Sequence, residues 1–471
     1  MKKIKILMLT LASSFAAMAA DIDVSPGKLE GLLADEDVRN EKIIRLKGNI
    51  DARDLAAIEN LGKEVETLDL KEVKIEALTM PNRKYFGRTL FSENEIPAYT
   101  FFKTSVRNLI LPAGTTMICE GAFAGSSITE IEIPDGVKSI GDYAFYGCKD
   151  LKKVTLPQSL ATIGKGAFGN CMSLESIDIS ATQIKELPER AFAGSVMLSQ
   201  IKLPVITKVG REAFSHTEIK KLDLSAATEF EAYALSSMPF LEELSINPDA
   251  IIGEGLLMDD ISLWSLSGMP ELVPDYFAAN NTELSSDLLK DAFTLGRYSF
   301  ANTNGAEEIM ISRSLSRIER GALSGIKGLA KINVVELINN IPEVDDLAFE
   351  GINQPDIILW VHNDYVDDWK SHPVWGFFNI QSSENEDTGI DDTLANASDS
   401  ITISFRDGKV VVEAAALVRD VKIYTTDGRI AFIASPGEQI FEIDADRLPS
   451  GVVVVTAADG NGSVKTISLL L

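Results

Sequence analysis

The sequence predicts an α/β solenoid with a parallel sheet, followed by a small antiparallel β-sandwich. The first observation is a spacing: an aromatic or Leu anchor follows an aliphatic residue by five positions, and the pair returns every 22 to 24 residues in the first half of the chain. The second is a short strand-like motif after each pair. The third is a change of period from about 22 to 2 near residue 400. Repeats of about 20 to 50 residues are typical of solenoids.

The anchors predict twelve turns. The spacing is regular up to Phe214 and looser beyond it, where Leu272 and Phe277 form one of the later pairs. A turn this short cannot bury its apolar residues alone, so each turn must stack on its neighbours. The anchors are Phe101, Phe123, Phe145, Phe168, Phe192, Phe214, Leu235, Leu257, Phe277, Phe300, Leu323 and Phe349.

Motifs such as LKKVTLP, residues 151–157, predict a short strand in each turn. Side chains alternate along a strand, so Val154 faces the core while Lys153 and Thr155 point outward. The glycine of the following IGxxAF motif, as at Gly164, suits a bend in which a side chain would crowd the chain. The same reasoning applies to Gly141 and Gly210.

Two segments carry a family resemblance: IEIPDGVKSIGDYAFYGC, residues 131–148, and VTLPQSLATIGKGAFGNC, residues 154–171. They resemble the BspA-like branch of the bacterial leucine-rich-repeat family, whose unit reads approximately LxxLxLPxxLxxIGxxAFxxC. The resemblance covers about residues 40–380 and weakens after Leu244. It implies a right-handed coil, and an exported, surface-associated binding or adhesion protein without catalysis. It names no ligand.

Residues 1–20 predict a secretory signal peptide, with lysines before a short apolar run and small residues at its end. Ala17-Met18-Ala19 offers a cleavage site, and the Ala20/Asp21 bond is the alternative. The chain has no later apolar run of about 18 residues, so no transmembrane helix is expected after cleavage. We therefore expect a secreted or cell-surface protein of a Gram-negative bacterium.

Residues 21–90 are expected to form an N-terminal cap with degenerate first repeats, because a solenoid end exposes an apolar cross-section. Residues 25–40 carry leucines at helical spacing. A strand is expected at Ile43–Leu46, a helix from about Asp51, and a first degenerate repeat strand at residues 66–75.

The solenoid is expected over residues 91–380, although its repeat decays between residues 247 and 306. There the spacing predicts inward positions for Ile261, Trp264 and Leu266. It also places Asp287 inward, where an unpaired carboxylate would be costly. This indicates a slip of register or a bulge, and a local functional insertion is the alternative.

Residues 355–380 are expected to close the solenoid, since they resemble the family's terminal element, a last strand followed by a short helix. The segment is rich in aromatic residues, which predicts a hydrophobic plug over the last coil. A carbohydrate-binding platform is the alternative. The residues concerned are Trp360, Trp369, Trp375, Phe377 and Phe378.

Residues 381–400 are polar, acidic and free of aromatic residues, so they predict a linker. Residues 401–471 then alternate strand-like segments with Asp-Gly pairs at 407–408, 427–428 and 459–460. Asp-Gly between alternating apolar residues is typical of β-hairpins. The segment therefore predicts the antiparallel β-sandwich.

VKIYTTDGRI followed by RLPSGVVVV resembles the C-terminal sorting domains of type IX secretion substrates. The sequence departs from that family at Val452, where an aromatic residue is usual, and at Leu469-Leu470-Leu471, where a basic strand is usual. A sorting module and a related β-module without that role therefore remain the two alternatives. Either could attach the protein to the cell envelope.

Charge and motifs limit the chemistry. The chain has 44 Lys and Arg against 70 Asp and Glu, with a net charge of −26. Nucleic acid is therefore not an expected partner. His216, His362 and His372 are scattered, and no nucleophile, phosphate or dinucleotide motif occurs. We expect no enzyme activity, metal or cofactor. The abundance of carboxylates keeps a polysaccharide-degrading enzyme only as an unfavoured alternative.

Cys148 and Cys171 each lie three residues after an anchor. They should stack on adjacent coils roughly 4.8 Å apart, a spacing that a disulfide tolerates. Equivalent positions in a ladder point in parallel, however, so two buried thiols are the favoured prediction.

The predicted function is extracellular recognition of, or adhesion to, a protein or glycan. A structural cell-surface component without a ligand site is the alternative. The outward strand positions form two ladders that carry polar side chains of both signs and contain no aromatic residue. The candidate contact residues are Glu130, Glu132, Lys153, Thr155, Asp178, Gln200, Lys202, Lys221, Asp223 and Glu243.

Overall fold

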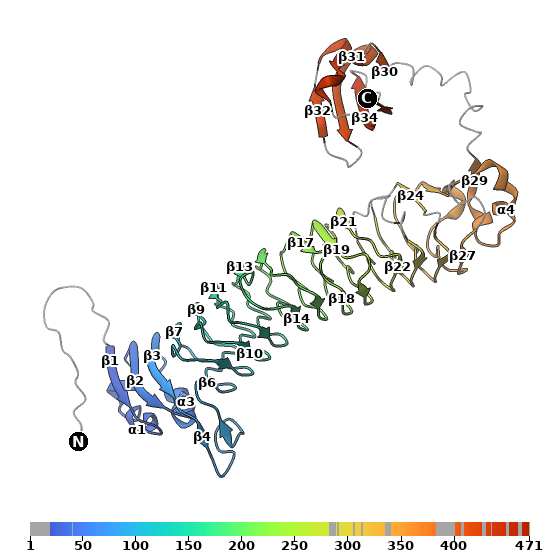
Figure 1. Ribbon diagram of the computed structural model, residues 1–471. Coiled ribbons are helices and arrows are strands. Elements are labelled where there is room, and N and C mark those ends of the chain that lie inside the picture. The colour runs from blue at the N-terminus through green and yellow to red at the C-terminus, as the bar shows by residue number, and fades with distance from the viewer. Residues whose placement is uncertain are drawn as a thin grey trace. The chain divides into compact units, whose positions relative to one another are not determined.

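The computed structural model contains two compact units, residues 1–383 and 384–471, and the first is a stack of coils (Figure 1). The residues that the structure describes are 19–39, 41–281, 289, 292–304, 307–311, 314–334, 341–382, 401–406, 409–425, 430–434, 436–448, 452–459 and 464–470.

The N-terminal segment continues directly into the repeat sheet, because β1, β2 and β3 pair in parallel and β3 pairs with the first repeat strand. The first strand begins at Ala19, two residues before the expected signal-peptide boundary, and residues 1–18 lie outside the described residues. The elements here are β1 (Ala19–Val24), α1 (Leu29–Leu32), α2 (Glu36–Arg39), β2 (Ile43–Ile50), α3 (Ala52–Ala57), β3 (Thr67–Ile75), β4 (Leu78–Thr79) and β5 (Leu90–Phe91).

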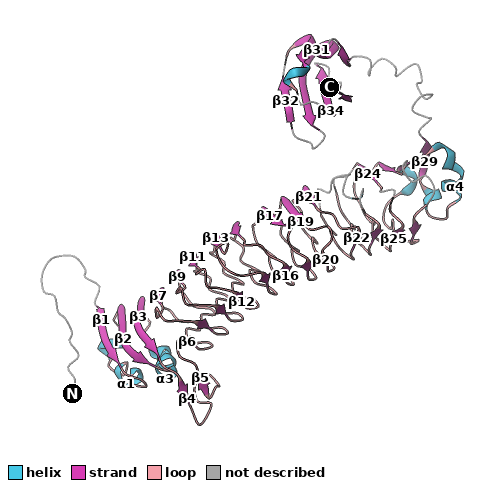
Figure 2. Cartoon of the chain, in the orientation of Figure 1, coloured by secondary structure: helices cyan, strands magenta, loops and turns pink. Residues whose placement is uncertain are grey.

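The expected strand and helix of this segment are confirmed. The Asp51 carboxylate accepts the backbone N–H of Arg53 at 2.9 Å, and the Asp54 carboxylate accepts that of Asp51 at 3.0 Å. This reciprocal capping satisfies free N–H groups at the start of α3. Figure 2 shows that helices occur near the two ends of the coil stack, and that turns connect the strands between them.

In the described part of the chain, a first strand row takes one strand from each of twelve coils, and the neighbours that pair in this row are parallel. In β9 and β11, for example, Glu130 lies opposite Lys153 and Glu132 lies opposite Thr155. The row comprises β7 (Asn108–Ile110), β9 (Glu130–Glu132), β11 (Lys153–Thr155), β13 (Ser176–Asp178), β15 (Gln200–Lys202), β17 (Lys221–Leu224), β19 (Glu243–Ile246), β21 (Ser265–Ser267), β24 (Glu308–Met310), β26 (Lys331–Asn333), β28 (Ile358–Val361) and β29 (Asn379–Ser382).

A second strand row, which the sequence analysis did not predict, runs along another side of the coils. In the described part of the chain it has twelve strands of two residues, one for each predicted turn. They are β6 (Glu95–Ile96), β8 (Met117–Ile118), β10 (Ser139–Ile140), β12 (Thr162–Ile163), β14 (Glu186–Leu187), β16 (Lys208–Val209), β18 (Glu229–Phe230), β20 (Ile251–Ile252), β22 (Leu272–Val273), β23 (Thr294–Leu295), β25 (Arg317–Ile318) and β27 (Glu343–Val344).

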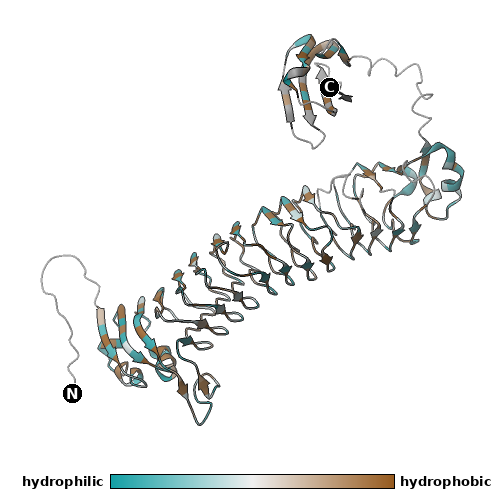
Figure 3. Ribbon diagram, in the orientation of Figure 1, coloured by the Kyte–Doolittle hydropathy of each residue, from teal (hydrophilic) through white to brown (hydrophobic). Residues whose placement is uncertain are grey.

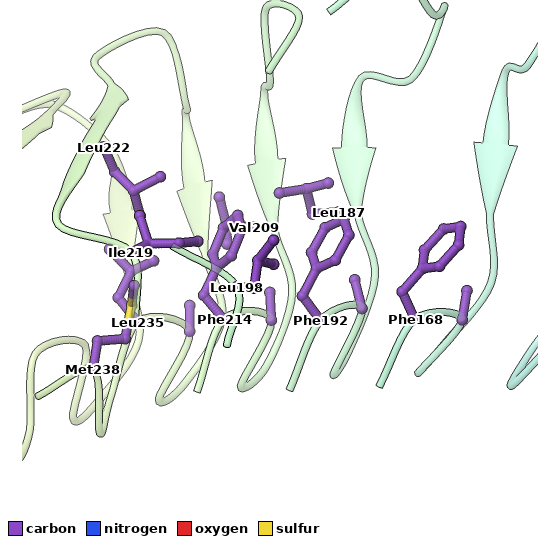
Figure 4. Close-up of a cluster of buried hydrophobic side chains, with 14 of the residues drawn as sticks. Phe168, Leu187, Phe192, Leu198, Val209, Phe214, Ile219, Leu222, Leu235 and Met238 are labelled. Atoms are coloured by element: carbon purple, nitrogen blue, oxygen red, sulfur yellow. The ribbon is translucent and has the colours of Figure 1, made fainter. Parts of the chain in front are cut away.

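All twelve anchors are buried, with exposed fractions of at most 4%. From Phe101 to Phe214 the six successive rings stack nearly parallel, with centroid distances of 4.7 to 5.9 Å and interplanar angles of 3 to 11°. Figure 4 shows three of these rings in the same position on adjacent coils, and Leu235 continuing the column. The coils therefore stack with their side chains in register.

Two inward positions of the decaying region were predicted wrongly. Trp264 is 54% exposed and Ile261 is 48% exposed. The reason is the register of β21, which places Leu266 opposite Leu244. In this register Leu263, two residues before the strand, is buried. Ile261 and Trp264, which were expected to face inward, face solvent instead. Asp287 lies outside the described residues.

The pair of Leu272 and Phe277 was also placed wrongly. Leu272 is 65% exposed, and its neighbour Val273 is 2% exposed and pairs with Leu295 of the next coil. Only four positions separate Val273 from Phe277, so this bend is one residue shorter than the bend of the earlier turns. The anchor itself was predicted correctly.

The C-terminal end of the coil stack contains α4 (Val366–Ser371) and a buried aromatic cluster. Trp369 and Trp375 are fully buried with ring centroids 5.4 Å apart, and Phe378 is 5% exposed. The predicted plug is confirmed for these three residues, whose burial leaves no ring face for a sugar. It is wrong for Phe377, which is 64% exposed, and for Trp360, described below.

The second unit is an antiparallel sheet with a core of its own. The long strand β31 pairs with β30 and β33 over its first half and with β32 and β34 over its second half. Hairpins flank all three predicted Asp-Gly turns, which themselves lie wholly or partly outside the described residues. The strands are β30 (Ile401–Arg406), β31 (Lys409–Thr425), β32 (Ile430–Ala434), β33 (Glu438–Asp444), β34 (Val452–Asp459) and β35 (Val464–Leu470).

The crowding predicted at the bend glycines is confirmed. A Cβ at Gly164 would lie 2.3 Å from the backbone nitrogen of Asp142 in the preceding coil. At Gly210 it would lie 2.6 Å from that of Glu189. Backbone cannot move aside as a flexible side chain can, so these glycines permit the close approach of successive coils.

We expect Gly164→Ala to lower the free energy of unfolding by about 1–3 kcal/mol, the usual effect of an added carbon in a packed site. Gly31→Ala is the matched control, because Gly31 lies in α1 with no atom within 4 Å of its Cβ position. Denaturant titration followed by circular dichroism measures both. Equal stability of the two variants would contradict the close-approach explanation.

Candidate functional site

The candidate site is the outward face of the first strand row. The strands turn their central apolar residue toward the core, as Val154 and Ile131 do, so the residues on either side must face outward. Figure 3 shows this alternation of hydropathy along the strands. Where adjacent strands pair, they do so in register, so the outward side chains of those coils line up as two ladders.

All ten predicted contact residues occupy such outward positions. Nine are exposed and Glu243 is half-buried. The structure brings several of them together in pairs across adjacent strands, as with Asp178 opposite Lys202 and Lys221 opposite Glu243. Whether they contact a ligand remains a prediction.

Ion pairs connect neighbouring strands along the ladders. Lys202 Nζ lies 3.1 Å from a carboxylate oxygen of Asp178, and Lys221 Nζ lies 2.6 Å from one of Glu243. Exposed pairs of this kind typically contribute only about 0–1 kcal/mol to stability. These side chains can therefore exchange their partners for a ligand's groups at small cost to the fold.

Two ladder carboxylates are held ionised by a serine two residues further on. The Asp178 carboxylate accepts the hydroxyl of Ser180 at 2.6 Å and its backbone N–H at 3.0 Å. These two hydrogen bonds lower the pKa of Asp178, and the ammonium group of Lys202 lowers it further. Ser225 does the same for Asp223 and lowers its pKa. Both carboxylates therefore present fixed negative charge on the outward face.

Two hollows lie over this face. One of about 580 Å³ spans β7, β9 and β11, and its lining includes Glu130, Glu132, Lys153 and Thr155. The other, of about 640 Å³, is lined in part by Lys221 and residues 223–226. Small-ligand sites commonly have volumes of about 300–1,000 Å³. Six of the ten predicted contact residues line one of these two hollows.

The sequence analysis missed an aromatic residue on this face. Trp360 pairs with Asn333 in β28, and Lys331 Nζ lies 4.8 Å from the centre of its ring. Trp360 is half-buried on the outward side and is therefore not part of the plug. The alternation in Ile358–Val361, where Leu359 and Val361 are buried, was the available signal.

The cysteines are free thiols, as predicted. Cys148 Sγ donates to the carbonyl oxygen of Phe123 at 3.1 Å, and Cys171 Sγ donates to that of Phe145 at 3.2 Å. Burial raises the pKa of Cys148 to about 11. At Cys119, burial and the nearby carboxylate of Glu95 raise the pKa to about 12. Such thiols stay protonated and are poor nucleophiles.

Asp260 lies three positions after the anchor Leu257, at the repeat position that Cys148 and Cys171 occupy in their own coils. It is fully buried, and one carboxylate oxygen accepts the backbone N–H of Met238 at 2.7 Å. The other has no hydrogen-bond partner among the described residues. Burial therefore raises the pKa of Asp260 well above its ordinary value.

Neither a metal centre nor a membrane span is found within the described ranges. No group of three or more His, Cys, Asp or Glu residues there could hold a metal ion. Among the helices that the structure describes, none has the length and apolar character needed to cross a bilayer.

The fold and this face define a repeat protein with a long polar strand surface. A family model, the BspA type Leucine rich repeat region, matches residues 94–220, 170–265 and 275–368, together more than half of the chain. The chain therefore belongs to the BspA-type leucine-rich-repeat family. No curated protein matches the sequence.

One solved structure supports the fold, and two others show weaker similarity. A leucine-rich repeat protein from Bacteroides ovatus is 20% identical over 79% of this chain and 93% of its own, with a TM-score of 0.53. A leucine-rich repeat protein from Eubacterium ventriosum is 16% identical over 71% of this chain and 90% of its own, with a TM-score of 0.36. The pneumococcal vaccine antigen PcpA is 15% identical over 78% and 82%, also with a TM-score of 0.36.

We expect Asp260→Asn to stabilise the protein increasingly as pH rises. An Asp with a raised native pKa favours folding fully below its unfolded pKa of about 3.9, and loses that contribution as pH rises toward the native pKa. Asn does not titrate, so the difference in Tm between variant and wild type should widen between pH 5 and 8. Thermal unfolding at several pH values measures it.

Asp178→Asn is the matched control, because the pKa of Asp178 is lowered and its effect on stability should be constant over the same range. If the Asp260→Asn difference is also independent of pH, Asp260 is not a buried acid of raised pKa.

Proposed function

We propose that this protein is an exported, non-catalytic leucine-rich-repeat protein that binds an extracellular protein or glycan through the outward face of its first strand row. The observation that carries the proposal is the register of that row, which aligns charged and polar side chains over many coils and places two hollows above them. Membership of a repeat family without a catalytic motif supports a binding role.

Contact with this face would be polar. From β7 to β26 the outward positions carry both signs of charge and no aromatic residue, whereas binding hot spots are enriched in Trp, Tyr and Arg. Trp360 adds an aromatic contact at the far end of the row. Binding should therefore depend on salt and gain from avidity.

The ends of the chain support a surface location. The signal-peptide pattern of residues 1–20 favours export, and the sequence of residues 401–471 resembles that of a sorting domain. We propose that this module serves export by the type IX route, attachment to the envelope, or spacing.

The replacement of Lys153, Lys202 and Lys221 together by Glu tests the strand face. A glycan array and an extracellular-matrix protein array, probed with the full chain, supply the partner. We expect the triple variant to lose about tenfold or more in affinity for an acidic partner, with the fold unchanged by circular dichroism, because exposed positions typically change stability by under about 0.5 kcal/mol each.

The control is the replacement of Lys138, Lys165 and Lys185 by Glu, which makes the same change of charge near the second strand row, where all three are exposed. Loss of binding only in the first variant supports the strand face. Equal loss in both would show that net charge alone decides. Absence of any partner on both arrays favours the structural-component alternative.

A further inference from the structure

A third cleft lies at the N-terminal end of the coil stack, away from the ladder residues. Its volume is about 810 Å³, and its lining comes from Glu30 of α1, from residues 53–63 around α3, from residues 84–86 between β4 and β5, and from residues 99–105 after β6. Figure 1 shows α3 and the strand β4 at this end of the solenoid. The cleft is therefore built from the cap and the first full turn together.

The cleft concentrates cations in a chain that is strongly acidic overall. Arg53, Lys63, Lys84 and Lys103 line it, against two carboxylates, Glu30 and Glu59. The nearby Asp51 already pairs with the guanidinium of Arg53, at 2.5 Å.

Three of these cations have no carboxylate partner among the described residues. Some lysines elsewhere pair with a carboxylate of the neighbouring coil, as Lys165 does with Glu189 at 3.1 Å. Lys63, Lys84 and Lys103 form no ion pair with any described residue, although acidic residues outnumber basic ones in the chain. The Lys84 ammonium lies 4.8 Å from the centre of the Tyr85 ring. The cleft therefore holds ammonium groups available to an anion.

Aromatic rings stand beside these cations. Tyr99 is 50% exposed and Phe102 is 48% exposed, and their rings meet edge to face with centroids 6.0 Å apart. Tyr99 is fixed in place, because its hydroxyl donates to Glu120 at 2.6 Å and its ring lies over Gly121, where a Cβ would approach within 2.3 Å. The Lys103 ammonium lies 4.9 Å from the centre of the Phe102 ring.

We propose that this cleft binds an acidic oligosaccharide. The apolar faces of the sugar rings pack against Phe102 and Tyr99, and a sugar carboxylate pairs with the ammonium groups of Lys103 and Lys63. The carboxylates of Glu30 and Glu59 accept hydrogen bonds from sugar hydroxyl groups. A simple anion would use the lysines but not the rings, and an apolar ligand would leave the charges unpaired. The volume lies within the range of small-ligand sites.

Calorimetric titration of the full chain tests this site with three probes: trigalacturonate, a hyaluronan tetrasaccharide and sialyllactose. We expect at least one to bind, and the Lys63→Ala/Lys103→Ala variant to bind it about tenfold or more weakly, the loss expected for charge-assisted bonds. Phe102→Ala should also weaken binding severalfold. Both variants alter exposed side chains, and circular dichroism verifies their fold.

Three controls separate the explanations. The methyl ester of the bound probe should bind at least tenfold more weakly if the sugar carboxylate is recognised. Hexaglutamate should not compete with the probe if packing of the sugar rings against Phe102 and Tyr99 is also required. Lys138→Ala, an exposed lysine outside both sites, should leave binding unchanged. The cleft and the strand-face hollows share no lining residue, so failure here and failure of the strand-face proposal are distinguishable. Absence of binding by all three probes, equal binding of the methyl ester, competition by hexaglutamate, or unchanged affinity in the cleft variants would overturn the proposal.

Discussion

The register between successive coils is the constraint on which the rest of the structure depends. Inside, it brings the ring of each anchor against the ring of the next, with centroids as close as 4.7 Å between Phe123 and Phe145. Stacked aromatic pairs contribute about 0.5–1.5 kcal/mol beyond their buried area. At the bends that carry glycine, as at Gly164, it brings the backbones of successive coils too close for a Cβ. A coil that slipped by one residue would lose both.

The same register arranges the outer surface. Since the inward residue of each strand is fixed by the core, its neighbours face solvent at a constant position, and their chemistry is not limited by packing. Lysines and carboxylates of adjacent coils thereby meet, as Lys221 and Glu243 do. The cap interrupts this regular surface, and the cleft beside α3 is formed where cap and coils join.

Much of the fold could be predicted from the sequence, because the anchors recur at a spacing that only stacking explains. All twelve anchors and the outward positions of the ten candidate residues were located in this way. The burial of Val273 in place of Leu272 could not be predicted. The bend before Phe277 is one residue shorter than the others, and spacing alone does not show where a residue is lost. Trp264 was misplaced because the repeat motif fits this segment in two registers. One register turns Ile261, Trp264 and Leu266 inward, and the other, which the structure adopts, turns Leu263 and Leu266 inward.

The site was less predictable than the fold. Strand alternation located the ladders, but the hollows above them and the cleft at Lys63 and Lys103 depend on segments far apart in sequence. Trp360 was assigned to the plug because aromatic residues cluster there in sequence, although only Trp369, Trp375 and Phe378 turn inward. Composition identifies an aromatic cluster, and strand pairing decides which members face the core.

A double-mutant cycle tests most directly whether coil-to-coil stacking holds the protein together. Phe145→Ala and Phe168→Ala remove adjacent rings whose centroids are 5.2 Å apart, while Phe123→Ala and Phe192→Ala remove rings separated by two intervening coils. Denaturant unfolding should show a coupling energy of about 0.5 kcal/mol or more for the adjacent pair and additive effects for the distant pair. Additive effects in both cycles, or equal coupling in both, would contradict the nearest-neighbour account.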